Sequence, residues 1–82
     1  MAERDEDSVR AASRILAVLQ AMNREPHSTL HSLHGATGLP KSTLVRLLKT
    51  LTADGYVSND PRHAGYQITS LVTSLSSGFH GD

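Results

Sequence analysis

The sequence predicts a small, mainly α-helical domain that carries one β-hairpin. Apolar residues recur at spacings of three and four over residues 9–22 and 44–51, which is the period of an α-helix. Glycine and proline separate these segments at Pro26, at residues 38–40 and at Gly55. After Gly55, two short runs with tyrosine and β-branched residues flank a turn-rich stretch, which is typical of a hairpin.

Length and composition exclude several classes of protein. The 82 residues, 38% of them hydrophobic, allow one domain with a modest core and exclude a two-lobed enzyme. The chain has no cysteine, so disulfides and thiolate metal sites are excluded, and we expect a cytoplasmic protein. The longest apolar run, residues 15–19, is too short to span a membrane, and the acidic start is no secretory signal.

The formal net charge of zero hides an uneven distribution. Residues 1–7 hold four acids and one base, whereas residues 8–53 hold six bases and one acid, a balance of 6 − 1 = +5. An acidic tail on a basic body is found in domains that bind polyanions, although a solvated surface has the same pattern. We expect residues 1–7 to be disordered.

The first helix is predicted to begin after Ser8, which can cap it, and to end before Pro26. Its predicted inner face consists of Val9, Ala12, Ile15, Leu16, Leu19 and Met22. A second helix is predicted for about residues 29–37. Gly38 ends it by supplying a left-handed backbone, and Gly35 within it disfavours the helix by about 1 kcal/mol relative to alanine.

The third helix is predicted for about residues 40–54, with Pro40 at the first helical position. Its inner stripe is Leu44, Leu47, Leu48 and Leu51. A helical wheel places Ser42, Arg46 and Lys49 on the opposite face, and the flanks hold Lys41, Thr43, Val45 and Thr50. This outer face therefore has bases and hydroxyls but no acid.

Two strands are predicted at residues 56–58 and 65–69, joined by a tip at residues 59–64 that contains Arg62. Residues 70–82 are predicted as a further helix, because apolar residues recur there at helical spacing up to Phe79.

Two helices joined by a tight glycine turn indicate a helix-turn-helix, and a hairpin after the second of them is a wing. Residues 8–69 are therefore predicted to form a winged helix-turn-helix. Its third helix fits the major groove of DNA, where arginine reads guanine and hydroxyls contact bases or phosphates. The candidate DNA-binding residues are Lys41, Ser42, Thr43, Arg46, Lys49 and Arg62. Arg62 at the tip could contact a phosphate or the minor groove.

These motifs resemble those of a known family. The block Gly38-Leu39-Pro40-Lys41-Ser42-Thr43, followed by Arg46-Leu47-Leu48 and Gly55-Tyr56-Val57, is similar to the N-terminal winged helix-turn-helix of the IclR (isocitrate lyase regulator) family. The resemblance covers about residues 8–79. The tail over residues 75–79 is similar to that of activators of hydroxyphenylpropionate breakdown.

The resemblance implies a bacterial transcription regulator that binds a palindromic operator as a homodimer. In the family, a C-terminal domain binds a small organic effector, so residues 70–82 would be the linker helix toward such a domain, which is absent from this sequence. The family commonly has alanine where this chain has His31 and His34, and a helix-favouring residue at Gly35. These departures bear on the packing of the second helix.

Other functions have weaker support. A winged helix can instead serve as a protein-interaction or dimerisation module, but such a module would not need three bases and no acid on the third helix. The pair His31 and His34 has metal-ligand spacing, yet no nearby acid completes a set, so we expect no metal and no cofactor. Neither a nucleophile elbow nor a glycine-rich phosphate loop is present, so we expect no enzyme.

Overall fold

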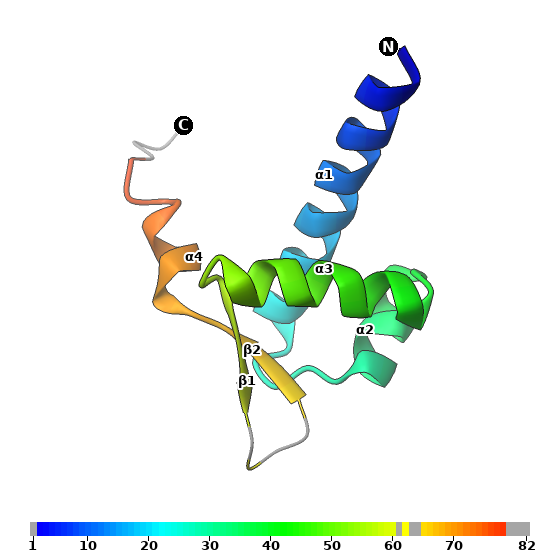
Figure 1. Cartoon of the computed structure of the whole chain (residues 1–82). Coiled ribbons are helices and arrows are strands. Elements are labelled where there is room, and N and C mark those ends of the chain that lie inside the picture. Colours follow the sequence, from blue (N-terminus) through cyan, green and yellow to red (C-terminus); the bar gives the residue numbers. More distant parts are fainter. Residues whose placement is uncertain (1, 61, 63–64, 79–82) are drawn as a thin grey trace.

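The chain forms three helices, a two-stranded hairpin and a short fourth helix, in the order α1, α2, α3, β1, β2 and α4 (Figure 1). The computed structural model describes the backbone of residues 2–60, 62 and 65–78, and side chains from Val9 onward. The elements are α1 (Ala2–Arg24), α2 (Leu30–Thr37), α3 (Lys41–Ala53), β1 (Val57–Asp60), β2 (Gly65–Ile68) and α4 (Ser70–Ser74). The predicted fold class, a winged helix-turn-helix, is confirmed.

Helix α1 begins earlier than the sequence predicted. It starts at Ala2 rather than after Ser8, so residues 2–7 are helical and the predicted disordered tail is wrong for them; Met1 lies outside the described residues. Extending an existing helix adds one hydrogen bond per residue without a new nucleation step. The acidic composition of this segment also suits a helix N-terminus, whose dipole favours negative charge.

Helix α2 is fixed by local hydrogen bonds at both ends. The Thr29 hydroxyl accepts from the Ser32 amide at 3.0 Å, and the Ser32 hydroxyl accepts from the Thr29 amide at 2.9 Å. This reciprocal capping box satisfies two amides that the helix leaves unpaired. At the other end, Gly38 has φ 75° and its amide donates to the carbonyl of His34, so the predicted glycine stop is confirmed.

Helix α3 begins at Lys41, one residue later than predicted. Pro40 has an extended ψ of 146°, so it precedes the helix instead of occupying its first turn. Helix α3 ends at Ala53, and Gly55 then turns the chain with φ 88°. The Tyr56 amide donates to the carbonyl of Leu51, which directs the chain into the hairpin.

Strands β1 and β2 are antiparallel, with Val57 opposite Ile68 and Asn59 opposite Tyr66. Strand β1 extends to Asp60, past the predicted end at residue 58, because the pairing with β2 continues up to the tip. Ser28 of the α1–α2 loop adds a β-bridge on the other side of β2. The Ser28 amide donates to the Tyr66 carbonyl, and the Ser28 carbonyl accepts from the Tyr66 amide.

Helix α4 is shorter than the sequence predicted. It covers only Ser70–Ser74, residues 75–78 form turns, and residues 79–82 of the predicted linker helix lie outside the described residues. Serine hydroxyls at residues 74, 76 and 77 each donate to a backbone carbonyl three residues earlier. Such local bonds compete with a regular helix and favour turns.

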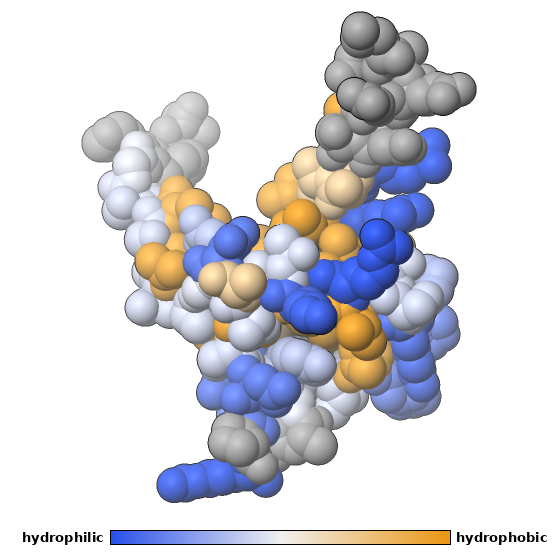
Figure 2. Space-filling model, in the orientation of Figure 1, coloured by the Kyte–Doolittle hydropathy of each residue, from blue (hydrophilic) through white to orange (hydrophobic). Residues whose placement is uncertain are grey.

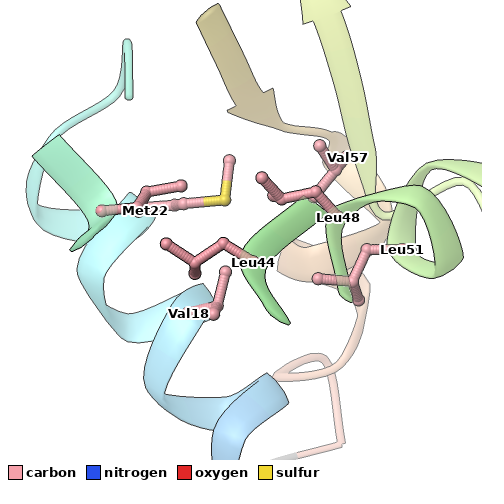
Figure 3. Packing of buried hydrophobic residues seen from close by; sticks show 7 residues of the cluster. Val18, Met22, Leu44, Leu48, Leu51 and Val57 are labelled. Atoms are coloured by element: carbon pink, nitrogen blue, oxygen red, sulfur yellow. The ribbon is translucent and has the colours of Figure 1, made fainter. Parts of the chain in front are cut away.

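The core lies where α1, α2, α3 and β1 meet. Its buried residues are Val18, Met22, Leu33, Leu44, Leu48, Leu51 and Val57, most of which Figure 3 labels. Full burial of side chains of this size stabilises the fold by about 1.5–3 kcal/mol each. The predicted inner stripe of α3 is largely confirmed, and only Leu47 in it is half-buried.

The predicted inner face of α1 is confirmed for Ile15, Leu19 and Met22 but wrong for Val9, Ala12 and Leu16. Val9 is 65% exposed and Leu16 is 58% exposed, whereas Val18, which was not predicted, is fully buried together with Met22. The physical reason is helical geometry: the packed face of α1 runs through Ile15, Val18 and Met22, and Val9 and Leu16 lie on the other side of the helix.

Candidate nucleic-acid interface

The outer face of α3 is the centre of the candidate interface. Ser42, Arg46 and Lys49 are exposed, while Leu44 and Leu48 on the opposite face are buried. Val45, at 44% exposed, is the one large apolar residue of α3 that reaches this surface. The core therefore holds α3 by one face and leaves its polar face open, which a helix in the major groove requires.

This surface has no compensating negative charge. Lys41, Arg46 and Lys49 give α3 three bases and no acid. Within the part of the chain whose side chains are described, none of the three forms an ion pair. Figure 2 shows hydrophilic side chains gathered over α3 and beside α1. An unpaired basic surface raises the local concentration of a polyanion such as DNA.

Two hollows flank α3 on the side of the wing. Lys41, at the start of α3, borders a hollow of about 550 Å³ together with His31 of α2 and Tyr66 of β2. Lys49 borders a second hollow, of about 410 Å³, again with Tyr66 and with Asn59 of β1. The structure thus brings two predicted DNA-binding bases next to the hairpin.

A third hollow, of about 230 Å³, lies between α1 and α3. Thr43 and Arg46 of α3 line it, together with Arg14 of α1. Thr43 is half-buried, in keeping with its predicted place on the flank of the helix. Arg14 was not among the predicted site residues, because nothing in its local sequence shows that this part of α1 passes beside α3.

The wing residue Arg62 lies apart from these hollows. Its side chain is exposed, and its amide donates to a carboxylate oxygen of Asp60 at 2.9 Å, which closes a small turn at the tip. Residues 61, 63 and 64 of the predicted tip lie outside the described residues. The hairpin therefore holds Arg62 at the far end of the wing, away from α3.

The turn between α2 and α3 sets the direction of α3. The Thr37 hydroxyl donates to the carbonyl of Leu33 at 2.7 Å and accepts from the amide of Leu39 at 3.2 Å. The Nδ1 atom of the His34 ring forms a hydrogen bond of 2.7 Å with the carbonyl oxygen of the same Leu39. Pro40 offers no side-chain cap to α3, so α2 side chains fix the peptide groups that precede the helix.

Two further findings bear on other kinds of site. Among the residues that the structure describes, no three histidine, cysteine, aspartate or glutamate side chains lie close enough together to hold a metal ion. None of the described helices is both long and apolar enough to cross a lipid bilayer.

Comparison with known proteins agrees with the predicted family. The model of the IclR helix-turn-helix domain matches residues 11–61. A transcriptional regulator from Rhodococcus sp. RHA1 superposes with a TM-score of 0.74 and is 31% identical, covering 84% of this chain and 27% of its own. An IclR transcriptional regulator from Alicyclobacillus acidocaldarius gives a TM-score of 0.66 at 31% identity, covering 87% and 28%.

HmgR from Pseudomonas aeruginosa superposes with a TM-score of 0.72 at 25% identity, covering 82% of this chain and 29% of its own. The chain thus spans less than a third of the length of each of these three proteins. The family match includes the whole helix-turn-helix, from the second half of α1 to the end of β1. The chain belongs to the IclR family of transcriptional regulators, in which it is a winged helix-turn-helix, DNA-binding domain.

Proposed function

We propose that this domain binds double-stranded DNA in a sequence-specific manner, with α3 in the major groove. The observation that carries the proposal is the outer face of α3, where bases and hydroxyls are exposed and no acid is present. The major groove is about 12 Å wide and admits one α-helix. In helix-turn-helix proteins the first turns of that helix contact the base edges.

The residues of α3 have different roles in this proposal. Arg46 is long enough to donate two hydrogen bonds to one guanine, and such a contact discriminates against a wrong base by about 1–3 kcal/mol. Ser42 and Thr43, in the first turn, read bases or bind phosphate through their hydroxyls. Lys41 and Lys49 neutralise phosphates, since each is exposed beside the hairpin.

The wing supplies a second point of contact. Arg62 is exposed at the end of the hairpin, where it reaches a backbone phosphate or the minor groove. A narrow minor groove has an enhanced negative potential that attracts arginine. The contact between wing and DNA is therefore electrostatic and adds affinity in any sequence.

The complete regulator is proposed to act as a cytoplasmic homodimer on a palindromic operator, with a small effector bound by a C-terminal domain. Val9 and Leu16 support the dimer, because both remain more than half exposed on α1 and suit burial against a second subunit. The tail at residues 75–79 is the basis for proposing the hydroxyphenylpropionate-activator subtype.

The proposal is tested by fluorescence anisotropy with a labelled mixed-sequence duplex over a range of salt. We expect binding to weaken steeply with salt and to fall in Arg46→Ala. Arg24→Ala removes the same charge at the far end of α1 and serves as the control. A folded protein that binds no duplex at low salt, even when dimerised through a fused coiled coil, would favour the protein-interaction role instead.

A further inference from the structure

We propose that the hollow between α1 and α3 is a binding site for a phosphate of the DNA backbone, with Arg14 as its principal ligand. The inference rests on the proposed function, because it needs α3 to lie in the major groove. It assigns a DNA contact to α1, a helix outside the helix-turn-helix pair.

The position of the hollow follows the geometry of the groove. A helix in the major groove has one phosphate backbone along each side. On one side of α3, Lys49 and Asn59 border the wing. On the other side of α3 lies the hollow lined by Arg14 and Arg46, where the second phosphate backbone would pass. A duplex centred on Ser42 and Arg46 would therefore bring its second backbone past the opening of this hollow.

The chemistry of the lining suits an oxyanion. Arg14 and Arg46 both line the space, and the planar guanidinium group of Arg14 suits phosphate, which it binds through paired hydrogen bonds. Thr43, which bears a hydroxyl, also lines the hollow, together with the apolar Leu47. Neither arginine has an acidic partner among the side chains that the structure describes. A hollow that is lined by cationic side chains and lacks an acidic partner favours the binding of a negatively charged group.

Arg14 is partly covered by its surroundings, and the residues beside it leave the space open. Arg14 is half-buried, so its methylene stem is partly covered while its charged end can reach solvent. Ala11, three residues earlier on the same face of α1, lines the hollow with only a methyl group. The Thr50 hydroxyl donates to the carbonyl of Arg46 at 3.1 Å, so it lines the hollow already engaged as a donor.

In this arrangement the two arginines have different roles. Arg46 projects from the exposed face of α3 and is available for a base edge, whereas Arg14 is set back on α1. Arg14 therefore contributes affinity that is independent of sequence. Removal of such a phosphate contact weakens binding to all duplexes by the same factor.

The test compares Arg14→Gln with Arg24→Gln by anisotropy, on two duplexes of unrelated sequence, from low to high salt. Arg24 is a matched control, because it lies on the same helix but lines a different hollow, between the end of α1 and α2. Each neutralised phosphate contributes about −0.9 to the slope of log K against log salt concentration. The loss of affinity caused by removing one phosphate contact is therefore about eightfold larger at 0.1 M salt than at 1 M salt.

We expect Arg14→Gln to reduce the salt slope by about 0.9 per subunit on both duplexes and Arg24→Gln to leave it unchanged. Arg14→Lys, which keeps the charge, should retain most of the slope. Thermal unfolding of each variant shows whether the fold is intact. An unchanged slope in folded Arg14→Gln, or an equal loss in Arg24→Gln, would overturn the inference while leaving the role of α3 standing. Absence of DNA binding by the unmodified protein would overturn both.

Discussion

The imidazole Nδ1 of His34 lies 2.7 Å from the carbonyl oxygen of Leu39, across the turn that joins α2 to α3. A carbonyl accepts only, so Nδ1 must hold the proton and donate. The Leu39 amide is held at the same time by the Thr37 hydroxyl. The peptide groups on both sides of Leu39 are therefore tied to α2, immediately before the helix that we propose to enter the major groove.

Loss of the His34 ring is expected to destabilise the turn. His34→Ala should lower the free energy of unfolding by about 0.5–1.5 kcal/mol relative to His31→Ala, as measured by urea denaturation. The comparison matters because both changes replace an exposed histidine of α2 by alanine and share the gain in helix propensity. His34→Asn, whose amide can occupy the place of Nδ1–H, should restore part of the loss. Equal stability of the two alanine variants would contradict the role of the hydrogen bond.

The two glycines at positions 35 and 55 are expected to respond to alanine in opposite directions. Gly35 lies within α2 and a Cβ there would meet no atom within 4 Å, so Gly35→Ala should stabilise the fold by up to about 1 kcal/mol. At Gly55 the φ is 88° and a Cβ would lie 2.9 Å from Leu71 Cδ1 of α4. Gly55→Ala should therefore destabilise the fold by about 1–3 kcal/mol.

Thermal and urea unfolding of the two variants measure this contrast. A Gly55→Ala variant as stable as the unmodified protein would show that neither the left-handed backbone at position 55 nor the contact with Leu71 costs stability. A destabilised Gly35→Ala variant would show that α2 needs its glycine for packing that the open space around position 35 does not indicate.

Replacement of a buried leucine of α3 and of an exposed leucine of α1 should have different effects on stability. Leu48→Ala should lower the free energy of unfolding by about 2–5 kcal/mol, because Leu48 is 1% exposed within the core. Leu16→Ala should change it by less than about 1 kcal/mol in the monomer, because Leu16 is 58% exposed. If Leu16 lies in the proposed dimer interface, its replacement should lower Tm more at high than at low protein concentration. A large loss in the monomer would mean that α1 packs differently.

The salt dependence of DNA binding tests the set of predicted contacts as a whole. If Lys41, Lys49, Arg62 and the proposed Arg14 contact each neutralise one phosphate, while Arg46 reads a base, the log–log slope should be about −3.6 per half-site, and about −7 for a dimer. Lys49→Gln should reduce it by about 0.9 per subunit and weaken binding to all sequences alike. A slope near −1 would show that most of these bases do not reach DNA.

Much of the domain could be predicted from local signals. The left-handed Gly38 and the leucine stripe of α3 each depend on a few neighbouring residues, and the structure has them where the sequence placed them. The polar outer face of α3 follows from that stripe by helical geometry alone. The fold class and the family could therefore be inferred before any contact was known.

The sequence misjudged features whose outcome depends on distant partners. Helical spacing put Val9 and Leu16 on the inner face of α1, but the core packs against the face through Ile15 and Val18, so Val9 and Leu16 are exposed. The acidic composition of residues 2–7 suggested disorder, although an adjoining helix can extend through such residues. The turn signal at Asn59 and Asp60 was overridden by their pairing with β2.

By itself, the sequence determined the ends of the two helices of the helix-turn-helix to within one residue, and which face of α3 stays polar, because period, caps and glycine turns act within a few residues. Only the tertiary structure decided that Arg14 lies beside Arg46, that Ser28 bonds to Tyr66, and that His34 holds Leu39. The crossing of α1 over α3 and the closing of the turn are set by the packing of Val18, Met22 and Leu44 in one core. No local pattern in the chain specifies that packing.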